Sequence, residues 1–523
     1  MKPYFAILCL CSATAFAQDN SAQPLSLEVE MQGSQSNSKT PFWLNANKYG
    51  LSSLAASNGY LRGTGIYNKD FFNEELKMQV GVDMVLPVGY KVAGYKSHYT
   101  RKCIVQQAFV EANWKYGVLT VGAKQQPMEL KNNELSSGSQ TLGINATPIP
   151  QVRLGLNDYW HVPYTKDWLA IKTHVAFGIM TDAPWETVAA KGSVNKYNRY
   201  TRYHEKAGYL RIGNEEKFPL SLTLGLEMAA QFGGSVYNWV GTDENGFKGG
   251  NMKLSSNFSS YFHAFTGTGS DTGEDTYSNA EGNNLGSWVA RLEWKDENFE
   301  FGAYLDHFFE DHSGMFLTEY DGYDEGTEWN VKKKRRFFLY ALKDIQLGFE
   351  LRLKDARWID MIVTELLFSR YQSGPIYHDH DEVISDHLGG QDNYYNHGIY
   401  TGWQHWGQVI GNPLYLSPIY NTDQNIYIKN NRSKAYHIGF SGSPYPRFHY
   451  RMLGTYLMGY GTYDIPYSDP RKTISLLAEA CYTFPSTSVL NNWSIKGALG
   501  ADFGKLMGDN FGMQLTIAKS GLF

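Results

Sequence analysis

The sequence has few cysteines, and it lacks apolar runs long enough to cross a membrane as helices. Only four of the 523 residues are cysteines, and Cys9 and Cys11 lie in the N-terminal segment. The other two, Cys103 and Cys481, fall in strand-like runs far apart along the chain, so we expect free, inward-facing thiols and no disulfide. Beyond the N-terminal segment, no stretch has the roughly 18 consecutive apolar residues of a transmembrane helix.

Charge is also scarce. Charged residues make up 19% of the chain and the formal net charge is -5, which gives no reason to expect a nucleic acid as partner. Aromatic residues are abundant instead, with 37 Tyr, 28 Phe and 13 Trp. This combination fits a chain that contacts both lipid and sugar.

The first residues have the pattern of a secretory signal peptide. Lys2 precedes the apolar stretch Tyr4–Leu10, and Ala15-Phe16-Ala17 offers a small-x-small cleavage site before Gln18. We therefore predict that residues 1–17 are removed and that residues 18–523 form an exported protein.

Apolar residues recur with a period of two along most of the chain. In 220–228, five apolar side chains alternate with small or polar ones, and 76–84 and 345–353 repeat the pattern. In a membrane barrel the apolar side faces lipid and the polar side faces the lumen. The pattern predicts an all-β protein, a transmembrane antiparallel β-barrel of the bacterial outer membrane.

The number and spacing of these runs agree with a barrel. The expected strands are 25–33, 57–68, 74–85, 102–114, 117–125, 151–159, 168–180, 202–214, 219–232, 286–296, 298–308, 345–354, 359–371, 433–442, 447–461, 471–484, 491–503 and 510–518. That count of about 18 is even, as a bacterial barrel requires. Short connections alternate with long ones, which we expect to be extracellular loops. The last strand ends near the terminal Phe523, an aromatic end typical of such barrels.

The positions of the tryptophans follow the predicted connections between strands. Six tryptophans lie in or beside predicted short turns, where they are expected to form a girdle at the periplasmic interface. They are Trp114, Trp160, Trp168, Trp294, Trp358 and Trp493.

The loop 372–432 has the densest set of candidate binding residues. Flat aromatic rings pack on the C–H face of a pyranose, while amides and carboxylates bind its hydroxyls. We therefore predict a polysaccharide-binding site in the long loops. Its residues are Trp43, Asp392, Asn393, Tyr394, Tyr395, Asn396, Tyr400, Trp403 and Trp406. A second interpretation, which does not exclude the first, is that these rings fold the loop back into the barrel mouth.

Other readings of the loops are less favoured. Histidines and acids between His378 and His405 match no defined zinc motif, so a hydrogen-bonded loop is preferred over a metal site. The basic run 332–336 fits a solvated loop edge, or a contact with acidic polysaccharide or lipopolysaccharide phosphate. Neighbouring acids such as Glu310 and Asp311 come without an organised nucleophile motif, so we expect neither an enzyme nor a cofactor.

Several segments, in a consistent order over most of the chain, resemble the Wzi-type capsule assembly family of outer-membrane proteins. The matching segments are Thr40-Pro41-Phe42-Trp43-Leu44 with Asn47, Tyr49 and Gly50; Leu135-Ser136-Ser137-Gly138-Ser139 with Asn145-Ala146 and Pro148-Ile149-Pro150; Gln231-Phe232-Gly233-Gly234; Phe308-Phe309-Glu310-Asp311 with Ser313-Gly314; Gln372-Ser373-Gly374-Pro375; and Asp392-Asn393-Tyr394-Tyr395-Asn396 with Gly411-Asn412-Pro413. The resemblance implies an 18-stranded barrel with an occluded lumen and a lectin-like role in holding capsular polysaccharide. The sequence has no long amphipathic helix like the family's plug.

The sequence therefore predicts an outer-membrane barrel that binds capsular polysaccharide and helps to attach or assemble the capsule. The alternative is a porin-like diffusion channel for glycans or small solutes. Expected partners are surface polysaccharide, outer-membrane lipid and lipopolysaccharide, and the barrel-assembly machinery. We expect a monomer.

Overall fold

The structure is a computed structural model that describes residues 24–51, 53–72, 75–90, 102–243, 246–268, 282–310, 318–319, 327, 336–339, 344–370, 372, 392–423 and 425–521. The predicted signal peptide, the terminal Phe523, most of the basic run 332–336, and His378, His380 and His387 lie outside these residues.

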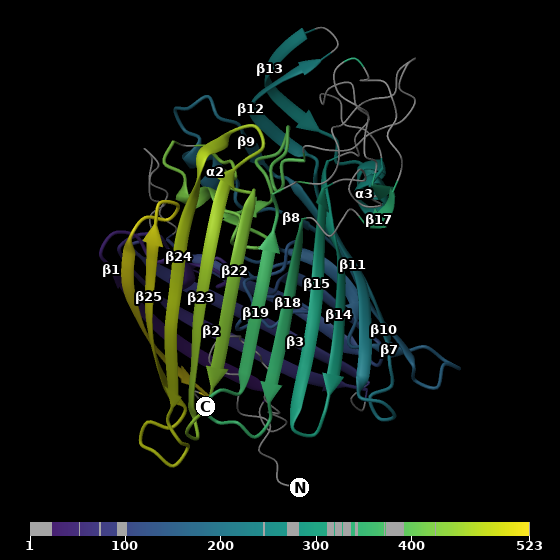
Figure 1. Cartoon of the computed structure of the whole chain (residues 1–523), viewed down its shortest axis with the longest axis vertical. Coiled ribbons are helices and arrows are strands. Elements are labelled where there is room, and N and C mark those ends of the chain that lie inside the picture. Colours follow the sequence, from purple (N-terminus) through teal and green to yellow (C-terminus); the bar gives the residue numbers. More distant parts are fainter. Residues whose placement is uncertain are drawn as a thin grey trace.

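Long antiparallel strands form one closed wall (Figure 1). The wall strands are β1 (Leu25–Ser36), β2 (Ser57–Phe71), β3 (Leu76–Val88), β4 (Ile104–Trp114), β5 (Gly117–Ala123), β6 (Gln151–Leu156), β8 (Leu169–Ile179), β10 (Arg202–Ile212), β11 (Leu220–Phe232), β14 (Asn283–Lys295), β15 (Phe299–Glu310), β18 (Ile345–Leu353), β19 (Met361–Phe368), β22 (Ser433–Gly442), β23 (Phe448–Gly461), β24 (Pro466–Thr483), β25 (Trp493–Gly504) and β26 (Asn510–Ser520). A short strand, β7 (Trp160–His161), pairs with β8.

The first and last strands close the ring. β1 pairs antiparallel with β26, with Met31 opposite Ile517, so the wall has no free edge. The predicted antiparallel barrel of 18 strands is confirmed.

Side chains alternate across the wall as the period of two requires. Val80 and Phe349 are exposed on the outer face, at 40% and 50%. Asp83, Glu227 and Glu350 are buried on the lumen side. The wall therefore has an apolar outside and a polar inside.

The connections differ at the two ends. The short turns lie at the end that also holds the C-terminus, and the long loops lie at the other (Figure 1). All six predicted girdle tryptophans are at the short-turn end; Trp114 ends β4 and Trp493 begins β25.

Both described cysteines are free. Cys481 is buried on the lumen side, whereas Cys103 is exposed, so its inward orientation was wrongly predicted because it lies before β4 begins.

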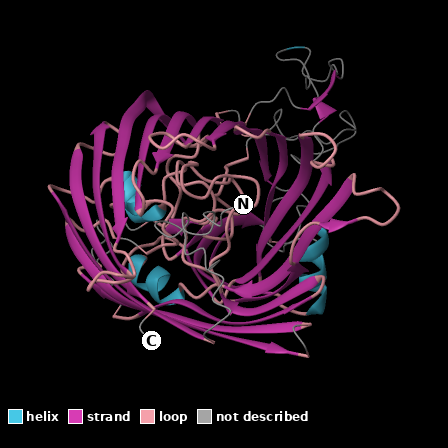
Figure 2. Ribbon diagram, turned by 90° about the horizontal axis from the view of Figure 1, so that it is seen from below, coloured by secondary structure: helices cyan, strands magenta, loops and turns pink. Residues whose placement is uncertain are grey.

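The long loops carry the remaining elements. They are α1 (Phe42–Asn45), α2 (Ala183–Ala189), α3 (Phe258–Thr266), the 3-10 helix η3 (Pro418–Tyr420), the three-stranded sheet β9 (Tyr197–Arg199), β12 (Gly234–Asp243) and β13 (Gly246–Leu254), the pair β16 (Thr318–Glu319) and β17 (Arg336–Leu339), and the pair β20 (Gln404–His405) and β21 (Gln408–Val409). None of the helices in the described ranges has the length and apolarity to cross a membrane. Figure 2 shows loops crossing the interior of the barrel.

Candidate functional site

Three loops meet inside the barrel, and we call them together the plug. They are the described residues of 37–56 between β1 and β2, of 124–150 between β5 and β6, and of 392–431 before β22. Their apolar side chains share one buried cluster with the wall. Plug members of this cluster include Phe42, Trp43, Leu44, Leu135, Ile149, Tyr394, Tyr395, Trp403, Tyr415 and Ile428. The predicted occlusion of the lumen thus comes from loops and not from a long helix.

The aromatic rings of 392–431 form the centre of the plug. Tyr394 and Tyr395 contact the ring of Phe308 on β15 edge-on, with centroids 4.7 and 5.3 Å apart. Trp403 stacks on Tyr203 of β10 at 5.6 Å and 17°. All of these rings are at most 2% exposed. The loop therefore folds back into the barrel and buries these rings, as the second interpretation of its sequence predicted.

Hydrogen bonds join this loop to 124–150. The hydroxyl of Tyr395 donates to the carbonyl oxygen of Gln140 and accepts from the backbone N–H of Asn412 at 3.0 Å. Trp403 Nε1 donates to the carbonyl oxygen of Thr141 at 3.1 Å. Buried polar groups that find such partners add specificity to an apolar core. Tyr395 and Trp403 are thus structural anchors in this conformation.

Trp43 is buried in the same way. The short helix α1 starts after Pro41, and the carboxylate of Asp502 on β25 accepts the backbone N–H of Phe42 at 3.0 Å. This orients Trp43 into the lumen, where its Nε1 donates to Thr455 Oγ1 at 3.0 Å. The rings of five predicted site residues are buried in this conformation, so none of them presents an exposed face to a sugar: Trp43, Tyr394, Tyr395, Tyr400 and Trp403. Their assignment to a polysaccharide-binding site stays a prediction.

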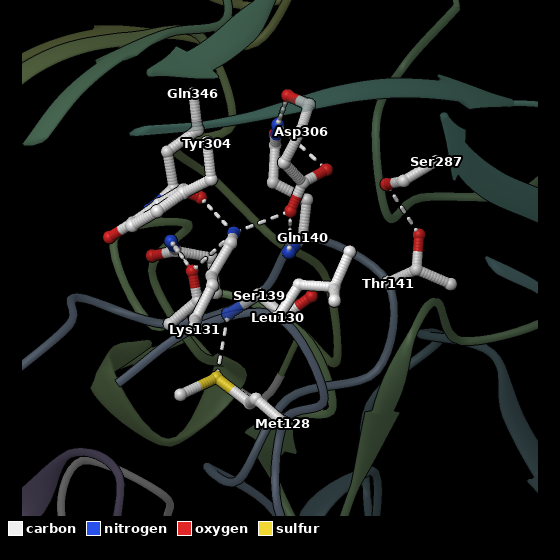
Figure 3. Close-up of polar contacts among 12 residues, drawn as sticks. Met128, Leu130, Lys131, Ser139, Gln140, Thr141, Ser287, Tyr304, Asp306 and Gln346 are labelled. Atoms are coloured by element: carbon white, nitrogen blue, oxygen red, sulfur yellow. Dashed lines mark hydrogen bonds and ion pairs between the residues drawn. The ribbon is translucent and has the colours of Figure 1, made fainter. Parts of the chain in front are cut away.

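The loop 124–150 crosses the lumen and is tied to the opposite wall. Lys131 Nζ donates to Asp306 Oδ2 of β15 at 2.5 Å and to Gln346 Oε1 of β18 at 2.6 Å (Figure 3). Glu365 of β19 accepts from Ser136 Oγ at 2.6 Å and from the backbone N–H of Ser137 at 2.8 Å. The sequence did not predict these contacts, because each pair is far apart along the chain.

The amides predicted to bind sugar also support the loop. Asn396 is buried; its side chain donates to the carbonyl oxygen of Ile428 and accepts from the backbone N–H of Ile428, both at 2.9 Å. Asn393 Nδ2 donates to Asp464 Oδ2 at 2.9 Å. Asp392 and Asn393 remain half-buried, so they lie closer to solvent than the rings.

Trp406 is the predicted aromatic residue that reaches the surface of the plug. β20 and β21 form a hairpin whose two-residue turn is Trp406-Gly407, with φ of 54° and 80°. Such turns favour Asn-Gly, and a bulky residue with positive φ is strained. Trp406 is half-buried, and its Nε1 donates to Thr181 Oγ1 at 3.2 Å. Strain of this kind is found at ligand-binding positions.

Buried acids hold the base of this hairpin. Gln404 Nε2 donates to Asp182 Oδ2 at 3.1 Å and to Glu186 Oε1 at 2.7 Å. Burial raises the pKa of Glu186 well above its usual range, and the charge of Asp182 raises it further. Burial also raises the pKa of Asp182. These donors and acids fix α2 against the plug.

The histidines of the loop have structural contacts. His397 Nδ1 accepts the backbone N–H groups of Ile399 and Tyr400 at 3.1 and 3.3 Å. Burial, together with the charge of Lys196, lowers the pKa of His397 to about 3, so the ring is neutral. Within the described ranges, no group of three or more His, Cys, Asp or Glu side chains is placed to hold a metal ion.

Comparisons with known proteins place the fold. No protein-family profile and no curated protein matches the sequence. The chain is similar in structure to Escherichia coli Wzi, described as an outer membrane protein involved in group 1 capsule assembly and a carbohydrate binding beta-barrel. The TM-score is 0.54 at 10% identity, over 94% of this chain and 83% of Wzi.

Two porins are also similar. A BenF-like porin from Pseudomonas fluorescens has a TM-score of 0.47 at 9% identity, over 95% of this chain and 98% of its own. Pseudomonas aeruginosa OprD has a TM-score of 0.45 at 9% identity, over 95% and 94%. At such identities the likeness to Wzi shows the fold alone. The chain is an outer-membrane-type β-barrel whose lumen is filled by its own loops.

Proposed function

We propose that this protein lies in the bacterial outer membrane as a closed barrel, and that its extracellular face binds capsular or other surface polysaccharide. The observation that carries the proposal is the plug. A channel needs an aqueous path through the lumen, but Tyr395, Trp403 and Lys131 are buried there against the wall. In a barrel closed in this way, a ligand binds to the outer loops and does not pass through the lumen.

The description of Wzi supports the same direction, since that protein is called a carbohydrate-binding barrel involved in capsule assembly. The two porins have TM-scores below 0.5, so their likeness to this chain does not support the channel alternative. The proposal assigns no chemical reaction to the chain. Its partners are polysaccharide, outer-membrane lipid and lipopolysaccharide, and the assembly machinery that inserts the barrel.

The residues of the predicted site differ in their exposure to solvent. Trp406, Asp392 and Asn393 are half-buried and are the members proposed to contact polysaccharide. The buried members act by positioning: Tyr395 and Trp403 hold 392–431 against 124–150. The same residue types that bind sugar when exposed here form the support beneath the binding surface.

The test uses the full barrel and the surface polysaccharide of its own bacterium. Purified protein in detergent is titrated with purified polysaccharide, and capsule retention is measured in cells that lack the protein and are complemented with variants. Trp406→Ala should reduce both polysaccharide affinity and retained capsule, with unchanged barrel abundance.

Tyr164→Ala is the matched control, because Tyr164 is a fully exposed aromatic residue in the connection between β7 and β8 at the opposite end. It should leave binding unchanged. Absence of polysaccharide binding by the wild-type barrel, together with normal capsule in cells lacking it, would contradict the proposal.

A further inference from the structure

The small sheet β9–β12–β13 stands beyond the barrel mouth and has two different faces (Figure 1). On its inner face, Val236, Trp239 and Leu254 pack with Ile399 and Tyr400 of the plug. The plug therefore fixes the sheet in place. The opposite face of the sheet makes none of these contacts with the plug.

The opposite face, which we call the outer face, carries an aromatic pair with a cation. Tyr197 of β9 and Tyr237 of β12 are cross-strand partners, and their rings stack with centroids 4.8 Å apart and planes at 10°. The guanidinium carbon of Arg199 lies 5.7 Å from the Tyr197 ring and 5.2 Å from the Tyr237 ring. All three side chains are half-buried, so part of each remains accessible to a ligand.

A second cation lies on the same face. Ser235 pairs with Arg199 on one side and with Lys253 of β13 on the other. Residues paired directly across strands share a face of the sheet. The outer face thus consists of Tyr197, Arg199, Ser235, Tyr237 and Lys253, and this set includes two cations and no acid. Lys253 is exposed.

The arrangement is pre-organised. Arg199 Nε donates to Thr187 Oγ1 at 3.0 Å, which orients the guanidinium. The next residue, Tyr200, is 64% exposed and has a φ of 58°, a strained conformation for a bulky residue. Gly234 lies close to the backbone of Arg199. A Cβ at position 234 would be 2.8 Å from the carbonyl oxygen of Arg199, so this close approach requires a glycine.

The outer face adjoins the surface already assigned to Trp406. Tyr197 and Trp406 both pack at the edge of one buried cluster, which contains Trp185, Ile419 and Ile426. A chain of sugars lying over Trp406 could therefore continue onto β9 and β12.

We propose that the outer face binds a carboxylated sugar unit, such as a hexuronate, of an anionic polysaccharide. The apolar face of the pyranose packs on the tyrosine pair, and Arg199 pairs with the carboxylate, with Lys253 adding longer-range attraction. This inference rests on the proposed function and adds the class of sugar and the residues that select it.

The experiment compares polygalacturonate with its methyl ester, which keeps the sugar ring but removes the charge. Both are titrated into the full barrel in detergent. The acid should bind at least about tenfold more tightly than the ester, and its affinity should fall as salt rises. Arg199→Gln should abolish this preference. The exposed variant Lys253→Gln, which leaves the fold undisturbed, should reduce it about threefold. Heat-modifiable gel migration verifies that each variant is a folded barrel.

Equal binding of acid and ester, no binding of the acid, or an unchanged preference in both variants would overturn the inference. Failure of the proposed function looks different, since the bacterium's own polysaccharide would then not bind even to the wild-type barrel. If that polysaccharide binds the wild type and Arg199→Gln equally, the proposed function stands and the inference fails.

Discussion

Lys131 and Asp306 form an ion pair inside the barrel lumen, with Nζ 2.5 Å from Oδ2 and side chains 4% and 0% exposed. Lys131 belongs to the loop 124–150 and Asp306 to β15. Asp306 Oδ2 also accepts the backbone N–H of Gln140 at 3.0 Å. One carboxylate therefore fixes two parts of the plug to the wall.

Removing one charge of this pair should loosen the plug. Asp306→Asn keeps the volume but leaves the Lys131 ammonium buried without its counter-ion, at a cost of about 3–5 kcal/mol. We expect a lower unfolding temperature and bursts of current in planar bilayers. Glu300→Gln is the control, since Glu300 pairs with Arg352 and Lys354 at 35% exposure and its loss should cost at most about 1 kcal/mol. Equal effects of the two changes would contradict the role of Lys131 in the plug.

Two tryptophans of one loop should respond in opposite ways. Trp403→Ala removes a fully buried ring stacked on Tyr203 and should cost about 3–5 kcal/mol. Trp406→Ala removes a half-buried ring and should cost less stability but more polysaccharide affinity. Thermal unfolding and polysaccharide titration on the same preparations check this. A stable Trp403→Ala barrel that no longer binds would mean that Trp403 contacts the ligand.

The lipid-facing side of the barrel wall should not tolerate a charged side chain. Leu224 is 44% exposed on β11, and Leu224→Arg near the bilayer midplane should destabilise the barrel by about 2–4 kcal/mol. Tyr164→Arg, in the exposed connection before β8, should have almost no effect. Folding into lipid vesicles at graded denaturant concentrations measures both. A tolerated Leu224→Arg would place β11 away from lipid.

Acid should loosen the plug near His397. The ordinary pKa of histidine, 6.5, falls to about 3 here, so the unfolded loop binds a proton that the folded loop excludes. This contribution to stability is complete above pH 6.5 and is lost as the pH falls toward 3. Hydrogen-exchange protection factors of the Ile399 and Tyr400 amides, corrected for intrinsic rates, should decrease over that range.

The matched variant is His397→Asn, whose amide oxygen can accept the same two N–H groups without titrating. Its protection factors should depend less on pH. An identical acid response in both proteins would assign the effect to other groups.

The wall could be predicted from sequence because its signal is local. The alternation at Leu220–Met228 places every second residue on one face, and nothing distant is needed to recognise it. The plug depends on distant pairs instead. Tyr395 meets Gln140, and the two are 255 positions apart in the chain. An aromatic-rich loop has the same composition whether its rings bind sugar or pack in a core, so the sequence left both alternatives open.

The outer face of the small sheet was missed for a related reason. Tyr197 and Arg199 are two positions apart, as expected for one face of a strand. However, β9 is only three residues long, and the sequence on either side of it predicts loops. Only the pairing of β9 with β12 brings Tyr237 beside them.

The plug closes the lumen, and a conductance measurement on the purified barrel is the most direct test of this closure. The purified barrel is reconstituted in planar bilayers with concentrated KCl. A variant in which residues 124–150 are replaced by a short Gly-Ser linker is the positive control, and the linker can close because Gly122 pairs with Gln151. We expect no stepwise openings in the wild type and clear channels in the variant. Steady channels in the wild type would contradict it.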